Sequence, residues 1–146
     1  MDELTFRPCK QGHLALIAPH EAFGPVQPLY LSPQFAELLN DNVGLSAWAG
    51  NHCVGAAGVI AIHKYRFLAW SFLSVNSGPF MLGITRKTKE VLDSFKDVRV
   101  EMAVNVDFKE GHRWAKLLGF QMEAPFMKCY GYLKEDQSLY SRFRSS

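Results

Sequence analysis

The turn SVNSGPFMLG, residues 74–83, contains the first residues that could do chemistry. An apolar segment ends before it, and a segment with helical periodicity begins within it. Unpaired backbone N–H groups at the start of a helix bind anions, because orphan donors and the positive end of the helix dipole coincide there. Ser77 and Gly78 are small enough to leave such groups accessible, whereas Pro79 has no N–H. The turn is therefore a candidate phosphate site, and the alternative is a capped helix start with a solvated basic face.

A second candidate is Glu101, which stands among apolar residues in the alternating segment VRVEMAV, residues 98–104. A carboxylate in such a strand can act as a general base that accepts a proton from a nucleophile. The alternative is a half-exposed strand position with no chemical role. Asn105 ends the same strand, where it can contact a ligand or serve ordinary turn chemistry.

The cysteines and histidines favour neither covalent nor metal chemistry. Cys9 with His13, and Cys53 beside His52, lack the third group and the oxyanion turn that covalent catalysis needs. The 5 histidines include no pair at i, i+4 spacing, so the sequence predicts no metal site. The aromatic segment RFLAWSFLS, residues 66–74, could stack on nucleic-acid bases, but aromatic strands more often form core, so we do not expect nucleic-acid binding.

Length and composition limit the class of protein. A chain of 146 residues with 48% hydrophobic residues can bury the core of a single domain, residues 1–146. A net charge of +2 is too small to predict wholesale binding to polyanions or to membrane surfaces. The N-terminal segment lacks the features of a secretory signal, and no apolar run approaches the ~18 residues of a membrane span. We therefore expect a cytoplasmic protein whose 3 cysteines are reduced.

The periodicity of the sequence predicts the elements that position these candidates. Alternation predicts strands at 4–8, 43–49, 54–62, 66–74, 98–104 and 120–133, the last with a break at Pro125, and one further strand near the C-terminus. Periods near 3.6 residues predict helices at 12–18, at 33–42 with Ser32 as cap, from Pro79 to Phe95, and at 107–118 with Asp107 as cap and Gly119 as stop. The proline-rich segment 19–33 is predicted to be a long connecting loop. Strands joined through helices favour parallel crossovers, so we expect a mixed sheet covered by helices.

This order of elements, together with the helix end RWAKLLGF at residues 113–120, resembles the GNAT (Gcn5-related N-acetyltransferase) superfamily. In that family the last core helix ends in a hydrophobic residue, lysine, a hydrophobic residue and Gly-Phe, and the segment 116–120 is close to this pattern. The first strand, LTFRP, is also similar to the family's. The N-terminal segment and HRWAKLLGF together resemble a small phage-encoded branch that includes internal virion protein A of tailed phages. The resemblance implies an α/β (α+β) fold with a central mixed sheet of about six or seven strands and helices on both faces.

The same resemblance implies transfer of an acetyl group from acetyl-CoA to an amine on a small molecule or protein, by direct attack and without a covalent enzyme intermediate. Residues implied in cofactor binding are Leu73, Val75, Ser77, Gly78, Gly83 and Asn105. Glu101 is the implied base, and Tyr130, with Tyr132 as its alternative, is the implied general acid.

Two departures from the family pattern support another hypothesis. The family turn carries Gln/Arg-x-x-Gly-x-Gly/Ala, which the bulky SVNSGPFMLG does not match. Ala115 stands where the family has the tyrosine that acts as its general acid. The alternative is therefore a catalytically silent GNAT-like phage protein that acts in the host cytoplasm or the virion as a binding module.

Overall fold

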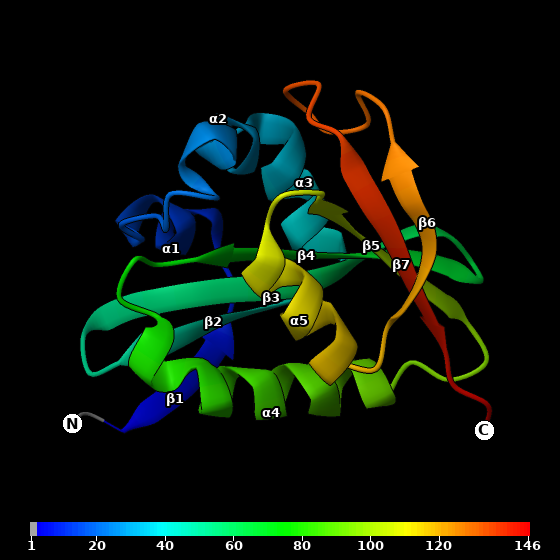
Figure 1. Ribbon diagram of the computed structural model, residues 1–146. Coiled ribbons are helices and arrows are strands. Elements are labelled where there is room, and N and C mark those ends of the chain that lie inside the picture. The colour runs from blue at the N-terminus through cyan, green and yellow to red at the C-terminus, as the bar shows by residue number, and fades with distance from the viewer. Residues whose placement is uncertain (1–2) are drawn as a thin grey trace. The chain divides into compact units, whose positions relative to one another are not determined.

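The computed structural model describes residues 3–146 and contains a 7-stranded mixed sheet with the strand order β1-β2-β3-β4-β5-β7-β6 (Figure 1). The strands are β1 (Leu4–Pro8), β2 (Val43–Ala49), β3 (His52–His63), β4 (Arg66–Leu73), β5 (Arg99–Asn105), β6 (Gln121–Met127) and β7 (Gln137–Phe143). The helices are α1 (Gln11–Leu16), α2 (Gln27–Tyr30), α3 (Pro33–Asp41), α4 (Met81–Asp93) and α5 (Lys109–Leu117), with short 3-10 turns η1 (Gly24–Val26) and η2 (Gly78–Phe80). The predicted fold class, a mixed sheet flanked by helices, is confirmed.

The chain divides into two compact units. Unit 1 contains the residues up to Ile60 together with Trp70–Ile84, and unit 2 contains Ala61–Ala69 together with Thr85–Ser146. Strands β3 and β4 therefore contribute residues to both units. That residues 1–146 form a single domain stays a prediction.

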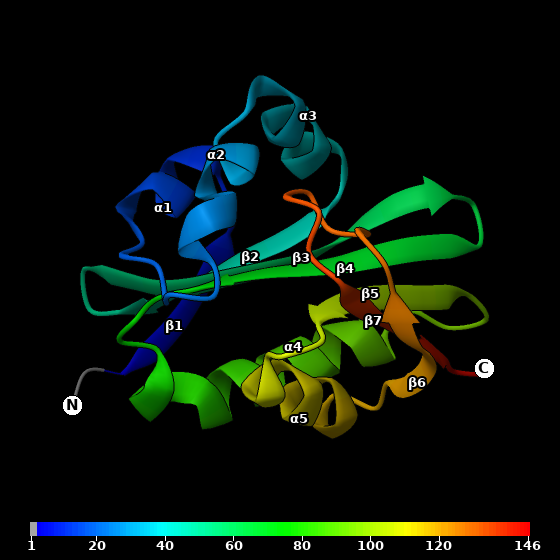
Figure 2. The same cartoon turned by 45° about the horizontal axis from the view of Figure 1, so that its top comes forward.

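In unit 1, β1 pairs antiparallel with β2, and β2 pairs antiparallel with β3. Helices α1–α3 lie on one face of these strands, and η2 with the first turn of α4 lies on the other (Figures 1 and 2). The core beneath α1–α3 contains two tryptophans, several aliphatic side chains and two cysteines: Cys9, Leu14, Ile17, Phe35, Leu39, Trp48, Cys53, Ala56, Ile60, Trp70 and Phe72. Burial of this apolar set is what holds the helices on the sheet.

In unit 2, β4 pairs in parallel with β5 through Arg66–Leu68 and Arg99–Glu101. The predicted parallel crossover is thus confirmed, with α4 as the connecting helix. Strand β7 pairs antiparallel with both β5 and β6. Residues Val100, Val104, Ala115, Leu118, Phe120 and Tyr140 form its buried apolar layer. Arg142 ties three elements together, because its guanidinium donates to the Leu118 carbonyl at 2.7 Å and to Asp93 at 2.6 Å.

Three local predictions differ from the structure. The predicted cap at Asp107 is wrong, because α5 begins at Lys109 with Phe108 as its N-cap and no side-chain hydrogen bond there. The segment 19–33 contains η1 and α2, in each of which the second residue is a proline that presets a helical φ. Strand β6 continues through Pro125 with an irregular register and ends at Met127, which an edge strand tolerates.

Candidate functional site

The turn between β4 and α4 satisfies most of its own backbone N–H groups. Four bonds form within it: Asn76 N to Ser74 Oγ, Ser77 N to the Ser74 carbonyl, Phe80 N to the Ser77 carbonyl, and Met81 N to the Gly78 carbonyl. The tight 3-10 geometry of η2 explains the last two, since an i to i+3 bond pairs donors that an α-helix start leaves free. The predicted cradle of open amides is therefore largely closed by the main chain itself.

Gly78 is the exception within this turn. Among the residues that the structure describes, no acceptor is found for its N–H, and a Cβ built on it would meet nothing within 4 Å. Pro79 has no N–H to offer, and Ser77 is 6% exposed. The turn thus presents one accessible backbone donor where the sequence predicted several.

Gly83 lies close to β1 in unit 1. A Cβ at this position would lie 2.7 Å from Leu4 Cδ2, so the missing side chain lets the first turn of α4 pack against β1. This contact is enough to explain a glycine at position 83 without a ligand. Its predicted role in cofactor binding stays a prediction.

The end of β4 is paired on both of its edges. Ser74 N donates to the Val54 carbonyl of β3 at 3.0 Å. On the other edge, His20 N donates to the Leu73 carbonyl at 2.9 Å and Val75 N donates to the Ala18 carbonyl at 2.9 Å. Pro19 and Ser74 form an isolated antiparallel bridge, and these two bonds lie on either side of it. Leu73 and Val75 were expected to hold a cofactor, and the Leu73 carbonyl and the Val75 N–H are thus bonded to the chain's own residues 18–20.

A pocket of about 450 Å³ lies beside this turn in unit 1. Its wall consists of apolar side chains and neutral polar groups, and it contains no lysine or arginine: Leu16, Ala18, Ala49, Asn51, His52, Cys53, Val54, Ser74, Asn76 and Phe80. A volume of this size suits a small ligand. Because the wall contains no lysine or arginine, the pocket offers little to a pyrophosphate.

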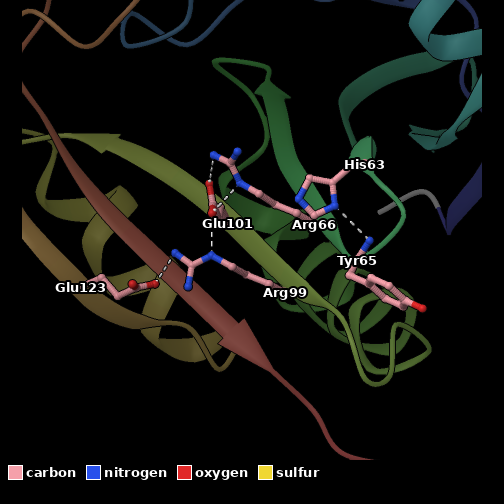
Figure 3. Close-up of polar contacts among 6 residues, drawn as sticks. All are labelled: His63, Tyr65, Arg66, Arg99, Glu101 and Glu123. Carbon is pink, nitrogen blue, oxygen red and sulfur yellow. Dashed lines mark hydrogen bonds and ion pairs between the residues drawn. The ribbon is translucent and has the colours of Figure 1, made fainter.

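In unit 2, Glu101 is the centre of a chain of ion pairs (Figure 3). Its two carboxylate oxygens accept from Arg66 at 2.8 and 2.9 Å, and one of them also accepts from Arg99 Nε at 2.5 Å. Arg99 in turn donates to Glu123 on β6. The glutamate side chain is 6% exposed, whereas those of Arg66 and Arg99 are 41% and 37% exposed. The residue is therefore neither a half-exposed strand position nor an unpaired carboxylate.

These pairs determine the electrostatics of Glu101. The hydrogen bonds from Arg66 lower the pKa of its carboxyl the most, and those from Arg99 add to the effect against the opposing cost of burial. A general base needs a pKa raised toward the working pH and a free lone pair aimed at the proton it takes. The pKa of the Glu101 carboxyl is lowered instead, and three of its acceptor positions are occupied by the arginines, so the geometry favours an electrostatic tie between β4 and β5.

Tyr130, the other predicted catalytic residue, lies in the segment between β6 and β7 and is 52% exposed. Tyr132 is 60% exposed in the same segment. The position where the family has its tyrosine, Ala115, is 0% exposed within α5, so that a phenol would not fit without rearrangement. Exposure is thus the feature that supports Tyr130 as general acid, and this role stays a prediction.

The structure also reveals a hydrogen-bonded pair that the sequence did not indicate. His112 Nδ1 lies 2.6 Å from the Tyr140 hydroxyl, and its Nε2 lies 3.1 Å from the carbonyls of Asn105 and Val106. Since carbonyls only accept, Nε2 carries the proton, and a neutral ring then accepts the tyrosine O–H at Nδ1. Tyr140 is fully buried, so the pair holds α5 against β5 and β7.

The Asn105 side chain points to another strand of unit 2. Its Oδ1 accepts from Gln137 Nε2 at 2.7 Å, so the amide oxygen fastens the end of β5 to the start of β7. This is the turn chemistry that the sequence left open as one alternative. A contact with a cofactor stays a prediction.

The cysteine and histidine pairs do not form catalytic dyads. Burial raises the pKa of the Cys9 thiol to about 12, and burial also raises that of Cys53. His13 bonds to Ser46 at 3.0 Å. A reactive thiol needs a lowered pKa, so both cysteines behave as core residues. Within residues 3–146 no group of three or more His, Cys, Asp or Glu side chains could hold a metal ion.

The described helices are all too short or too polar to cross a membrane.

Comparison with known proteins places the fold. No family model and no curated protein matches the chain. Among solved structures, Ard1 from Thermoplasma volcanium is 14% identical with a TM-score of 0.75 and covers 98% of this chain and 99% of its own. A GNAT superfamily phosphinothricin acetyltransferase from Sinorhizobium meliloti, in complex with AcCoA, is 12% identical with a TM-score of 0.70 and coverages of 97% and 89%. An N-acetyltransferase from Staphylococcus aureus is 10% identical with a TM-score of 0.70 and coverages of 97% and 97%. The chain therefore has the fold of the GNAT acetyltransferases.

Proposed function

We propose that the protein transfers an acetyl group from acetyl-CoA to an amine on a small molecule or a protein. The observation that carries the proposal is the likeness of nearly the whole chain to acetyltransferases, one of them in complex with AcCoA. Fold alone does not establish an activity. The chain's own groups therefore have to be tested for their fit to the cofactor.

The fit to acetyl-CoA is incomplete in the arrangement described here. The Gly78 N–H, beside the first turn of α4, is an open donor for a pyrophosphate oxygen. The pantetheine arm would need main-chain partners at Leu73 and Val75, and both are bonded to residues 18–20. The Leu73 carbonyl and the Val75 N–H are therefore not free for the arm in this arrangement. The cofactor, when bound, would supply the activated acetyl thioester.

Acetyl transfer also needs one group that takes a proton from the amine and another that gives a proton to the leaving group. Glu101 is an ion-pair partner, so an amine acceptor would lose its proton to another base or to water. Tyr130 is the accessible hydroxyl that we propose for protonating the departing thiolate, which leaves as the thiol of CoA. Replacing Tyr130 with phenylalanine should lower kcat with little change in the affinity for acetyl-CoA, because the phenol would act on the leaving group and not on cofactor binding.

Isothermal titration with acetyl-CoA tests the proposal directly. Micromolar binding is expected, followed by acetylation of members of an amine panel that mass spectrometry detects. Gly78→Glu should weaken binding at least about tenfold, because it places a negative side chain in open space beside the proposed anion site. Gly12→Glu is the matched control, since a Cβ there also meets nothing within 4 Å. Absence of binding at millimolar acetyl-CoA would remove the proposal.

A second candidate is a GNAT-like module that binds a partner without chemistry, as in the phage-encoded virion-associated branch. The observation that favours it is the pairing of residues 18–20 with the β4 edge, together with the buried Ala115. This candidate predicts that acetyl-CoA fails to bind even when that edge is opened.

A further inference from the structure

The C-terminal part of one edge of β4 is closed by the segment that follows α1. Leu73 and Val75 bond to His20 and Ala18, as described above. Further back, the Tyr30 hydroxyl donates to the Ser71 carbonyl at 3.3 Å. Figure 2 shows the chain after α1 descending to the sheet before it turns into α2.

All three bonds lie on the same edge of β4. Neighbouring residues of a strand direct their backbone groups to opposite edges. Ser74 faces β3, because its N–H donates to Val54. Ser71, Leu73 and Val75 therefore face away from β3, on the edge that carries no β3 bond. The segment Ala18–His20, which we name the strap, takes the place of a neighbouring strand there.

The strap has firm anchors on either side. Ile17, which precedes it, is 2% exposed in the core. Phe23, which follows it, packs edge-on against Phe72 with ring centroids 6.0 Å apart. Pro19 has no N–H, so the middle of the strap cannot donate a main-chain bond. Two main-chain hydrogen bonds, those to Leu73 and Val75, join the strap to the end of β4, while its anchors belong to the core.

From this geometry we infer that the strap is a displaceable closure, and that an extended ligand carrying amide groups competes with it for Leu73 and Val75. The inference rests on the proposed function, for which the ligand is the pantetheine arm of acetyl-CoA. An extended ligand that adds to a sheet edge gains affinity from main-chain bonds. It can gain them here only after the strap leaves. The observed affinity is therefore the affinity of the open form multiplied by the fraction of molecules in which the edge is open.

A reversible lock tests the inference. Pro19 and Ser74 face each other as a pair without mutual hydrogen bonds, flanked by the two bonds of the strap. Such antiparallel pairs have Cα atoms about 4.5 Å apart, within the range that a disulfide spans. The double variant Pro19→Cys and Ser74→Cys, in a Cys129→Ser background, should therefore oxidise to a closed form and open again with reductant. Each single cysteine variant, treated with the same oxidant, is the control.

An opening variant complements the lock. His20→Pro removes the N–H that bonds to Leu73, whereas His20→Ala keeps this donor and removes only the ring. We expect His20→Pro to bind acetyl-CoA about fivefold to tenfold more tightly than His20→Ala, since one hydrogen bond no longer opposes the ligand. Hydrogen exchange at the Val75 amide should be faster in His20→Pro, which verifies that the strap is open more often.

The outcomes separate the strap from the proposed function. Binding in the reduced double variant and its loss, by at least about tenfold, in the oxidised form would support the inference. Equal binding in the two forms would overturn the inference and leave the acetyl-CoA proposal standing. If His20→Pro exchanges the Val75 amide rapidly and still does not bind millimolar acetyl-CoA, the strap is not the barrier, and the inference and the proposed function both fail.

Discussion

Replacement of Glu101 with glutamine tests whether this residue ties β4 to β5 by charge. The carboxylate accepts three hydrogen bonds from Arg66 and Arg99, and its side chain is 6% exposed. Hydrogen bonds to charged groups contribute about 1.5–3 kcal/mol each, but both arginines are more than a third exposed, so solvent screens part of this. We expect Glu101→Gln to lower the free energy of unfolding by about 2 kcal/mol at neutral pH.

The pH dependence of this loss carries the sharper test. The pKa of the Glu101 carboxyl lies below its usual value of 4.5, so folding favours the ionised form. Its stabilisation is fully present above about pH 4.5 and is lost as the pH falls through the lowered pKa of the folded state. The difference between the wild type and Glu101→Gln should therefore shrink as the pH approaches about 3.

Urea unfolding followed by tryptophan fluorescence, at a series of pH values, measures the loss of unfolding free energy and its pH dependence. Glu123→Gln is the matched control, because Glu123 is 42% exposed and has an ion pair with Arg99 and a hydrogen bond from Ser141, so its loss should be clearly smaller. A loss below about 0.5 kcal/mol at neutral pH would refute the electrostatic tie. A loss that stays constant across the pH series would show instead that packing, and not charge, carries the effect.

Three further predictions concern packing, capping and thiol chemistry. Gly58→Ala should lower the free energy of unfolding by about 2–3 kcal/mol in urea unfolding, because the new methyl group would lie 2.7 Å from Nε1 of the buried Trp70; an unchanged midpoint would contradict this. Ser32→Ala should cost about 1 kcal/mol by the same assay, since Ser32 Oγ caps α3 by accepting from Phe35 N at 3.2 Å, and a Ser32→Asp variant should keep most of the stability. In native protein only Cys129 should react quickly with a disulfide reagent, because burial raises the pKa of the other two thiols; rapid modification of all 3 cysteines before unfolding would refute this.

The elements were largely predictable because their signals are local. The strand predicted at 43–49 coincides with β2, and the helix predicted from Pro33 coincides with α3 and its Ser32 cap. Gly119 has φ of 88°, as a left-handed helix stop requires. Alternation, a helical period and a cap each depend on a few consecutive residues. The predicted cap at Asp107 was wrong because the neighbouring residue, Phe108, is the N-cap of α5.

The candidate site was less predictable, since its properties depend on residues far apart in the sequence. Glu101 was recognisable as a charge in an apolar strand, but its partner Arg66 lies 35 residues away. The turn after β4 looked open because sequence cannot show that Val75 N finds the Ala18 carbonyl. The pairing of His112 with Tyr140 spans 28 residues and left no pattern in either segment.

The amino-acid sequence by itself determined the order of strands and helices, the burial pattern and the likeness to an acetyltransferase fold, because periodicity and turn chemistry act over short stretches of chain. Only the tertiary structure decided whether the groups that such a fold offers a cofactor are free. A backbone N–H or a carboxylate has the same chemistry wherever it occurs in a sequence. Whether it is free to bind a ligand depends on which distant segment of the folded chain bonds to it. Here the strap reaches β4, and two arginines reach Glu101.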